Sequence, residues 1–210
     1  MDWTTVVSSQ TNSGIAHGHV AEDLFSLVHW TVFTTAPTAA KLAVDTSLWG
    51  YEQIRRRKYY FLDRKKLLKR ILRTTNIALF QKQKESNCKL GAYVEGVFCN
   101  VGTRAAWVGC IGKGSMYELR TNGERRILGY IADEETHNEQ DALGRERYSW
   151  SSQETNIPFE QGDLLILAAG DAATISIGVF DEIAQHPEDC KEIINRERPH
   201  SSWGVTILKK

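Results

Sequence analysis

The most informative part of this sequence is the stretch Gly162-Asp163-Leu164-Leu165-Ile166-Leu167-Ala168-Ala169-Gly170-Asp171. Six apolar residues follow one another in it, and a Gly/Asp pair stands on either side. An unbroken apolar run of this length, bounded by turn-forming residues, is typical of a short strand that is buried on both faces. The sequence therefore predicts a buried strand over residues 164–169.

Outward from this strand, the sequence pattern predicts groups of strands and groups of helices. In the N-terminal half, strands are predicted over 3–7 and 24–33 with a loop over 8–21, and helices over 34–57 and 63–84. Four strands follow, over 89–99, 104–111, 115–120 and 126–131, and then an irregular acidic segment over 132–161. After the buried strand, the pattern predicts a strand that turns helical over 174–180, a helix over 189–197 and a strand over 205–208. Because the two kinds of element are grouped rather than alternating, we expect an α+β fold with antiparallel sheets in layers. A single domain over residues 1–210 is the simplest organisation.

The composition excludes several classes of protein. The chain has 210 residues, of which 41% are hydrophobic and 25% charged, so it is neither disordered nor collagenous. Its 26 basic and 26 acidic residues balance, which gives no reason to expect binding to nucleic acid or to a membrane. The start of the sequence shows no secretory signal, and its four cysteines form no CxxC pair, so we expect reduced thiols in the cytoplasm.

Several motifs, taken in order, resemble those of the metal-dependent PPM or type-2C serine/threonine protein phosphatases. The stretch from Gly162 to Asp171 is similar to the family's "G-D-x-L-L-L-x-S-D-G" segment. The stretch 108–117 stands in the place of its "G-D-S-R-x-Y" hairpin, Glu22-Asp23 in the place of its "N-E-D" opening, and 205–208 in the place of its closing strand. The resemblance implies two antiparallel sheets packed as a sandwich with helices outside, a four-layer αββα arrangement.

The family hydrolyses phosphoserine and phosphothreonine with water held by two Mg²⁺ or Mn²⁺ ions, which require several carboxylate oxygens. Matched position by position, this sequence lacks nearly all of those carboxylates. The degenerate positions are Thr34, Thr35, Lys113, Gly170, Trp203 and Gly204. The resemblance thus implies a pseudophosphatase, with no catalytic residue, no metal expected, and Glu22, Asp23 and Asp171 as candidates for a residual Mn or Mg site. We also hypothesise that Trp203 helps to fill the emptied cleft.

The second predicted helix carries a basic outer face formed by Lys66, Lys69, Arg70 and Arg73, opposite an apolar stripe. A solvated helix face explains this pattern, and a surface for a partner protein is the functional alternative. The lost site and the role of the family favour a protein partner, for example a kinase or a phosphoprotein in signalling. An active Mn/Mg-dependent phosphatase with a rearranged metal site and a structural subunit of a homo-oligomer remain as alternatives.

Overall fold

The computed structural model describes residues 4–10, 15–23, 26–33, 37–56, 64–85, 94–102, 104–129, 142–144, 147 and 152–210. In chain order the elements are β1 (Thr4–Gln10), β2 (Ile15–Asp23), β3 (Ser26–Phe33), α1 (Pro37–Arg56), α2 (Arg64–Glu85), β4 (Glu95–Gly102), β5 (Ala105–Ile111), β6 (Gly114–Leu119), β7 (Arg125–Gly129), β8 (Gln153–Pro158), β9 (Leu164–Gly170), the short 3-10 helix η1 (Asp171–Thr174), α3 (Ile177–Gln185), η2 (Pro187–Asp189), α4 (Cys190–Glu197) and β10 (Trp203–Lys209). No helix within these ranges combines the length and the apolar content that crossing a bilayer requires.

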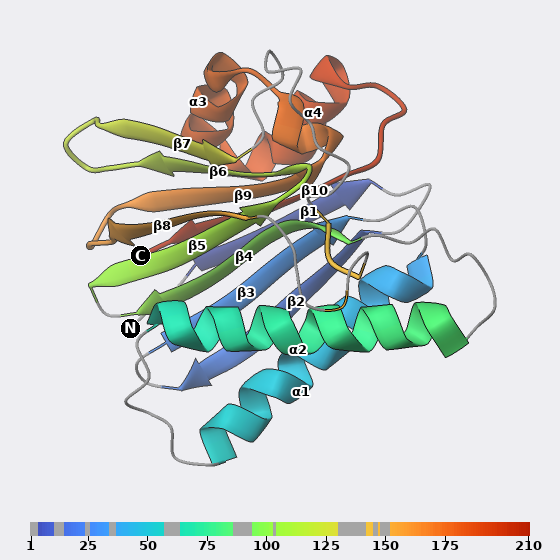
Figure 1. Cartoon of the computed structure of the whole chain (residues 1–210). Coiled ribbons are helices and arrows are strands. Elements are labelled where there is room, and N and C mark those ends of the chain that lie inside the picture. The colour runs from blue at the N-terminus through green and yellow to red at the C-terminus, as the bar shows by residue number, and fades with distance from the viewer. Residues whose placement is uncertain are drawn as a thin grey trace.

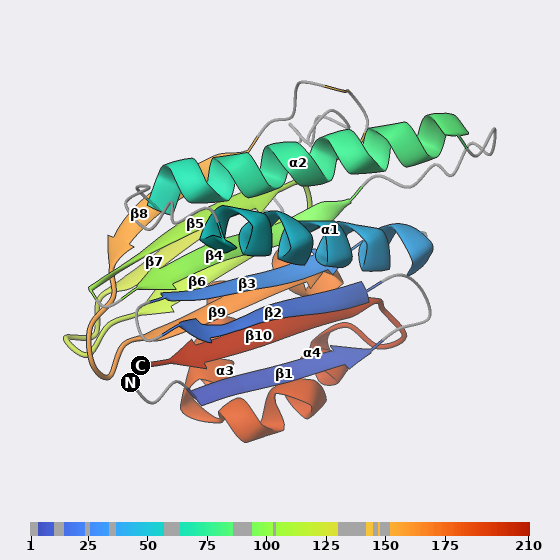
Figure 2. The same ribbon diagram turned by 90° about the horizontal axis from the view of Figure 1, so that it is seen from below.

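The strands form two five-stranded sheets in the orders β1-β10-β9-β6-β7 and β2-β3-β4-β5-β8. All eight strand pairs are antiparallel. Figures 1 and 2 show the two sheets stacked face to face, with α1 and α2 on the outer face of the second sheet and α3 and α4 on the outer face of the first. The expectation of an αββα sandwich is confirmed.

The strand β9 is buried over its whole length, as its apolar run predicts. Leu164 and Ile166 belong to the core beneath α3 and α4, whereas Leu165 and Leu167 belong to the core between the sheets. Because neighbouring side chains of a strand point to opposite faces, both faces of β9 need apolar residues. This explains why the run has no polar alternation.

The sequence pattern misses two edge strands. The predicted loop 8–21 is wrong, since β1 extends to Gln10 and most of the remainder is β2, and the predicted irregular segment 132–161 contains β8. Both β2 and β8 pair with one neighbour only, so they carry fewer apolar residues than a central strand. Over 174–180 the predicted initial strand is wrong, since η1 ends at Thr174, but the predicted helical part is confirmed, since α3 begins at Ile177.

The turn between β5 and β6 carries the chain from one sheet to the other. At Gly114 a Cβ atom would lie only 2.1 Å from the carbonyl oxygen of Gly96, so the backbones of β4 and β6 are in direct contact there. Only glycine fits such an approach. This contact fixes the distance between the two sheets at one end of the sandwich. At the same end, β3 and β9 finish and β10 begins.

Two buried asparagines allow a matched test of polar burial. Both polar side-chain atoms of Asn100 in β4 are buried without a hydrogen-bond partner within the described part of the chain. Asn76 in α2, also fully buried, accepts a hydrogen bond of 2.7 Å from the Gly144 N–H and donates one of 3.2 Å to the Arg147 carbonyl. We expect Asn100→Leu to raise the free energy of unfolding by about 1–2 kcal/mol, because an unpaired buried amide is costly.

The control Asn76→Leu should lower the same free energy by about 2–3 kcal/mol, because it leaves two backbone groups unpaired. Urea denaturation of the two variants and the wild type measures both changes. Destabilisation of equal size in both variants would contradict the interpretation of Asn100.

A second prediction concerns stability at alkaline pH. Tyr117 is buried under α3, stacks on Phe180 with a centroid distance of 5.4 Å, and donates its hydroxyl hydrogen bond to Asp181. Burial, together with the Asp181 carboxylate, raises the pKa of Tyr117 to about 12. The folded state favours the protonated phenol. The contribution of Tyr117 to the free energy of unfolding is therefore complete below pH 10 and is lost as the pH rises through 12.

The free energy of unfolding of Tyr117→Phe should therefore fall less between pH 10 and pH 12 than that of the wild type. Urea denaturation at a series of pH values compares the variant with the wild type. If the plots of unfolding free energy against pH stay parallel for the two proteins up to pH 12, Tyr117 does not titrate with unfolding.

Candidate functional site

Several strand ends meet at one edge of the sandwich. Phe33 at the end of β3 pairs with Glu95 at the start of β4, and Gly170 at the end of β9 pairs with Trp203 at the start of β10. The Gly170 N–H donates a hydrogen bond of 3.0 Å to the carbonyl of Lys113, in the β5–β6 turn. We call the residues Glu95, Lys113, Gly170, Asp171 and Ser202 the candidate edge. The structure thus brings Lys113, Gly170 and Trp203 together in the backbone, while Thr34 and Thr35 lie outside the described residues.

The two carboxylates of the candidate edge are both hydrogen-bonded to backbone N–H groups. Oε2 of Glu95 accepts a bond of 3.0 Å from the Lys113 N–H, and Oδ2 of Asp171 accepts one of 3.2 Å from the Ser202 N–H. The Asp171 N–H in turn donates to the Ser202 carbonyl at 3.1 Å. Each carboxylate therefore ties one strand end to another segment of the chain.

Sequence reasoning missed Glu95. The strand predicted over 89–99 places this residue inside the strand, whereas β4 begins at Glu95, which is half-buried at the edge. The signal that could have found it is Gly96, since a glycine beside a strand start marks a close approach of backbones.

Gly170 occupies a backbone conformation that an aspartate does not readily adopt. Its φ is 69° and its ψ is −141°, in a region that is essentially restricted to glycine. An aspartate side chain at this position would therefore strain the backbone. Asp171, one position later, begins η1 and is half-buried.

Trp203 does not fill a cleft between the sheets, so that hypothesis is wrong. Its side chain is fully buried in the core beneath α3 and α4, together with Val205 and Ile207. The indole Nε1 donates a hydrogen bond of 3.2 Å to Oδ1 of Asn195 in α4. The alternation of β10 places Gly204 on the opposite face, so only Gly204 of this pair faces the other sheet.

Glu22 and Asp23 lie at the other end of the sandwich. Asp23 pairs with Ser26, and Ser26 pairs with Gly102 at the end of β4, whereas the candidate edge contains the start of β4. A strand as long as β2 separates its two ends by about 25 Å. The hypothesis that Asp171 acts with Glu22-Asp23 as one residual metal site is therefore wrong. Glu22 and Asp23 end β2 at the opposite end of the sandwich from Asp171.

The donor set of the candidate edge does not fit a pair of divalent ions. The sequence contains no Asp or Glu over residues 3–21 and 24–44, so the end of β1, the start of β2 and the end of β3 supply no carboxylate. Glu95 and Asp171 are the acidic residues at the described strand ends of this edge, and each already accepts a backbone hydrogen bond on one oxygen. Hard divalent ions require six or more oxygen ligands each, and Lys113 adds a positive charge.

Two other clusters of charged residues lie away from the candidate edge. Ligand atoms of His186, Glu188 and Asp189 lie within 4.8 Å of one another, on an exposed turn between α3 and α4. Exposed acidic groups commonly gather in this way without binding a metal.

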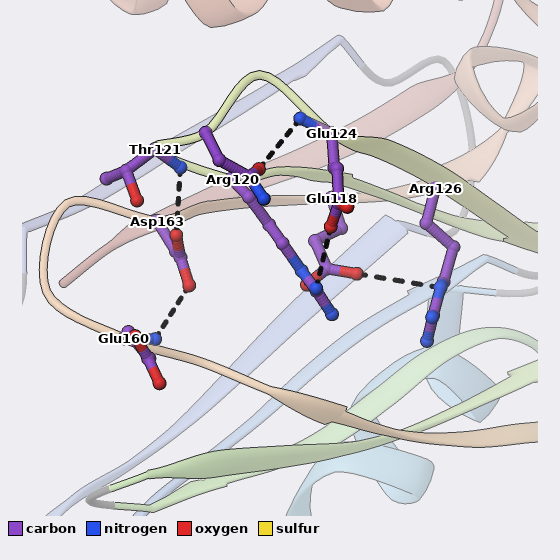
Figure 3. A network of polar contacts seen from close by, with 8 residues as sticks. Glu118, Arg120, Thr121, Glu124, Arg126, Glu160 and Asp163 are labelled. Atoms are coloured by element: carbon purple, nitrogen blue, oxygen red, sulfur yellow. Dashed lines mark hydrogen bonds and ion pairs between the residues drawn. The ribbon is translucent and has the colours of Figure 1, made fainter.

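Figure 3 shows the other cluster, around Glu118 and Asp163. The buried Asp163 carboxylate accepts hydrogen bonds from the N–H groups of Thr121 at 3.1 Å and Glu160 at 2.7 Å. The buried Glu118 contacts Arg120 at 2.9 Å and Arg126 at 3.8 Å, and it holds the pKa of Arg120 above its usual value. The Gly-Asp pair that opens the 162–171 motif is thus structural, since Asp163 orders the turn before β9.

The four basic residues of α2 form a second candidate surface. All four are exposed, as the sequence predicts for an outer face: Lys66, Lys69, Arg70 and Arg73. Lys69 forms an ion pair of 3.3 Å with Glu154 of β8. The helix α2 that carries them lies in the outer helix layer, away from the interface of the two sheets (Figure 2).

The glycine conformation at position 170 yields a stability prediction. Gly170→Asp should lower the free energy of unfolding by about 1–3 kcal/mol, because a side chain strains this backbone region. The control Gly178→Ala, at an exposed helical position with open space for a Cβ, should raise it by about 0.5–1 kcal/mol. Urea denaturation measures both. A Gly170→Asp variant as stable as the wild type would contradict the glycine-only backbone conformation at position 170.

No known family profile and no curated protein matches this chain. Solved structures do. The catalytic domain of the serine/threonine phosphatase PstP, in complex with two manganese ions, has a TM-score of 0.71 at 16% identity, with 99% of each chain covered. Stp1 from Staphylococcus aureus has a TM-score of 0.75 at 12% identity, covering 99% of this chain and 94% of its own. RsbX, in complex with magnesium, has a TM-score of 0.66 at 13% identity, covering 99% and 96%. This chain therefore has the fold of the PPM-type serine/threonine phosphatases.

Proposed function

We propose that this chain is a non-catalytic phosphatase-fold domain that acts by binding another protein. The observation that carries the proposal is the state of the candidate edge. Its two described carboxylates, Glu95 and Asp171, both accept backbone hydrogen bonds and stand beside Lys113. Metal-assisted hydrolysis needs ions that are anchored by several free oxygen donors, and this edge supplies too few.

Electrostatics supports the same conclusion. In an active site of this type the cations lower the pKa of the attacking water and offset the charge of the phosphoryl group. The positive charge of Lys113 offsets one of the two carboxylates, so the described edge offers divalent cations little net negative charge. The fold matches that of metal-bound neighbours, whereas the described part of this edge offers only the carboxylates of Glu95 and Asp171.

A binding role in regulation suits the structural neighbours. RsbX and a protein of the bacterial stressosome, described as a modular system that controls secondary messenger signalling, share this fold at TM-scores of 0.66 and 0.59. We propose a protein partner, such as a kinase or a phosphoprotein, and a cytoplasmic setting. The described cysteines Cys99, Cys110 and Cys190 are buried thiols, which suits a reducing compartment.

Hydrolysis of a chromogenic phosphate ester with Mn²⁺, combined with manganese calorimetry, tests the proposal. We expect no metal-dependent turnover and no heat above the buffer control, next to an active phosphatase of the same fold as the positive control. Lys113→Asp should not restore turnover, because one added carboxylate still leaves the donor set incomplete.

The rival hypothesis, an active enzyme with a rearranged metal site, predicts Mn²⁺-dependent turnover. Such turnover would overturn the proposal if Asp171→Asn, Glu95→Gln or Asp23→Asn abolishes it while the control Glu188→Gln on the exposed turn preserves it. Light scattering of the purified chain tests the remaining alternative, because a structural subunit would form a stable homo-oligomer without any partner.

A further inference from the structure

The outer surface of the α1–α2 layer contains an apolar groove. The helices approach closely where Gly50 faces Thr74, and the buried hydroxyls of Ser47 and Thr75 are 2.7 Å apart. Outside this contact lies a groove of about 460 Å³, with Trp49 from α1 and Ile77 from α2 among its lining residues. The contact holds the two helices together, so the groove is part of the folded surface.

Trp49 is the main feature of this groove. The sequence favours the core for most tryptophans, yet 58% of Trp49 is exposed, the largest exposure of any bulky apolar residue in the described ranges. An indole left largely in water forgoes hydrophobic stabilisation that a partner surface would supply. Tryptophan and arginine are the residues most enriched at the centres of protein interfaces, where a partner covers them.

The basic row of α2 continues directly into the groove. Lys66, Arg70, Arg73 and Ile77 follow one another at intervals of four, three and four residues, so they lie on one side of the helix. All three of these basic residues are exposed, and Lys69 is exposed beside them. An apolar groove is therefore flanked at one end by a row of positive charges.

Polar residues contribute little of the surface of the groove, and one of them is already bonded within its helix. The hydroxyl of Thr74 donates a hydrogen bond of 3.0 Å to the carbonyl of Arg70. Asp45 on α1 is the one carboxylate among the described lining residues. The groove therefore combines an apolar lining around Trp49 and Ile77 with basic residues that precede Ile77 on α2.

We propose that this groove binds an acidic amphipathic segment of a partner protein. A large apolar side chain of that segment packs against Trp49 and Ile77, and the carboxylates that accompany it lie over Arg70 and Arg73. Charge complementarity argues for this occupant, because the exposed basic residues of α2 beside the groove outnumber its one described lining carboxylate, Asp45. The inference rests on the proposed binding function and names its surface.

A synthetic peptide with a Leu-Phe pair next to a run of glutamates serves as the probe. Two-dimensional ¹H–¹⁵N NMR follows the indole Nε1–H of Trp49, identified by its loss in Trp49→Phe. We expect a saturable shift of this signal and of the backbone amides around Ile77, which added salt weakens. The same peptide with lysines in place of glutamates, or with serines in place of the Leu-Phe pair, should produce no such shift.

Charge reversal supplies the matched variants. The double variant Arg70→Glu/Arg73→Glu should raise the dissociation constant at least about tenfold, as expected when central interface residues are changed. The control Lys191→Glu/Lys209→Glu makes the same change of net charge at exposed positions outside the α1–α2 layer and should leave the constant unchanged. Circular dichroism confirms that both variants fold.

Three results would overturn the groove assignment. They are a Trp49 signal that the probe does not move, an affinity that Arg70→Glu/Arg73→Glu leaves unchanged, and a homodimer that Trp49→Ala dissociates. A single-stranded oligonucleotide that produces the Trp49 shift in place of the acidic peptide would also replace this proposal. None of these results bears on metal-dependent hydrolysis, so failure of the groove and failure of the proposed function are separable.

Discussion

The contact between the backbones of Gly96 and Gly114 sets the geometry of the candidate edge. Because the β5–β6 turn lies directly against the start of β4, the Lys113 N–H reaches the Glu95 carboxylate at 3.0 Å. The Lys113 carbonyl then accepts from Gly170, which places Asp171 beside Ser202. A series of hydrogen bonds therefore runs from one sheet to the other along this edge, and it depends on the absence of a side chain at position 114.

The same hydrogen bonds explain how the fold persists without ions. In a metal-bound sandwich the cations join strand ends by attracting carboxylates from different strands. Here backbone N–H groups of Lys113 and Ser202 occupy the carboxylates of Glu95 and Asp171. Hydrogen bonds between a charged acceptor and a backbone donor are among the stronger ones in proteins. The architecture of this edge therefore does not depend on metal ions, because backbone hydrogen bonds join its strand ends.

The central part of the fold was predictable from sequence because its signals are local. The apolar run of β9 and the helical periodicity of α2 identify their elements without tertiary information. The edge strands β2 and β8 were not predictable, since one neighbour and one covered face suffice to hold a polar segment extended. At the candidate edge, the sequence identifies Lys113 and Gly170 as non-acidic positions, and the structure brings their backbones together, whereas the role of Glu95 could not be predicted. The error with Glu22-Asp23 arose because motif order does not say at which end of a hairpin a residue lies.

The separation of the two surfaces gives the retained fold a physical role. The α1–α2 groove lies on the outer helix layer, and its shape depends on the packing of Ile71 and Leu72 against Phe98 of the sheet beneath. A change at the sandwich edge that preserves this core leaves the groove intact, because interactions at well-separated sites are nearly independent. A binding surface on the helices therefore constrains the core of the second sheet and the α1–α2 contact, but it places no demand on carboxylates at the strand ends. Under that constraint alone, ligands for metal ions can be lost while the sandwich is conserved as a support for the helices.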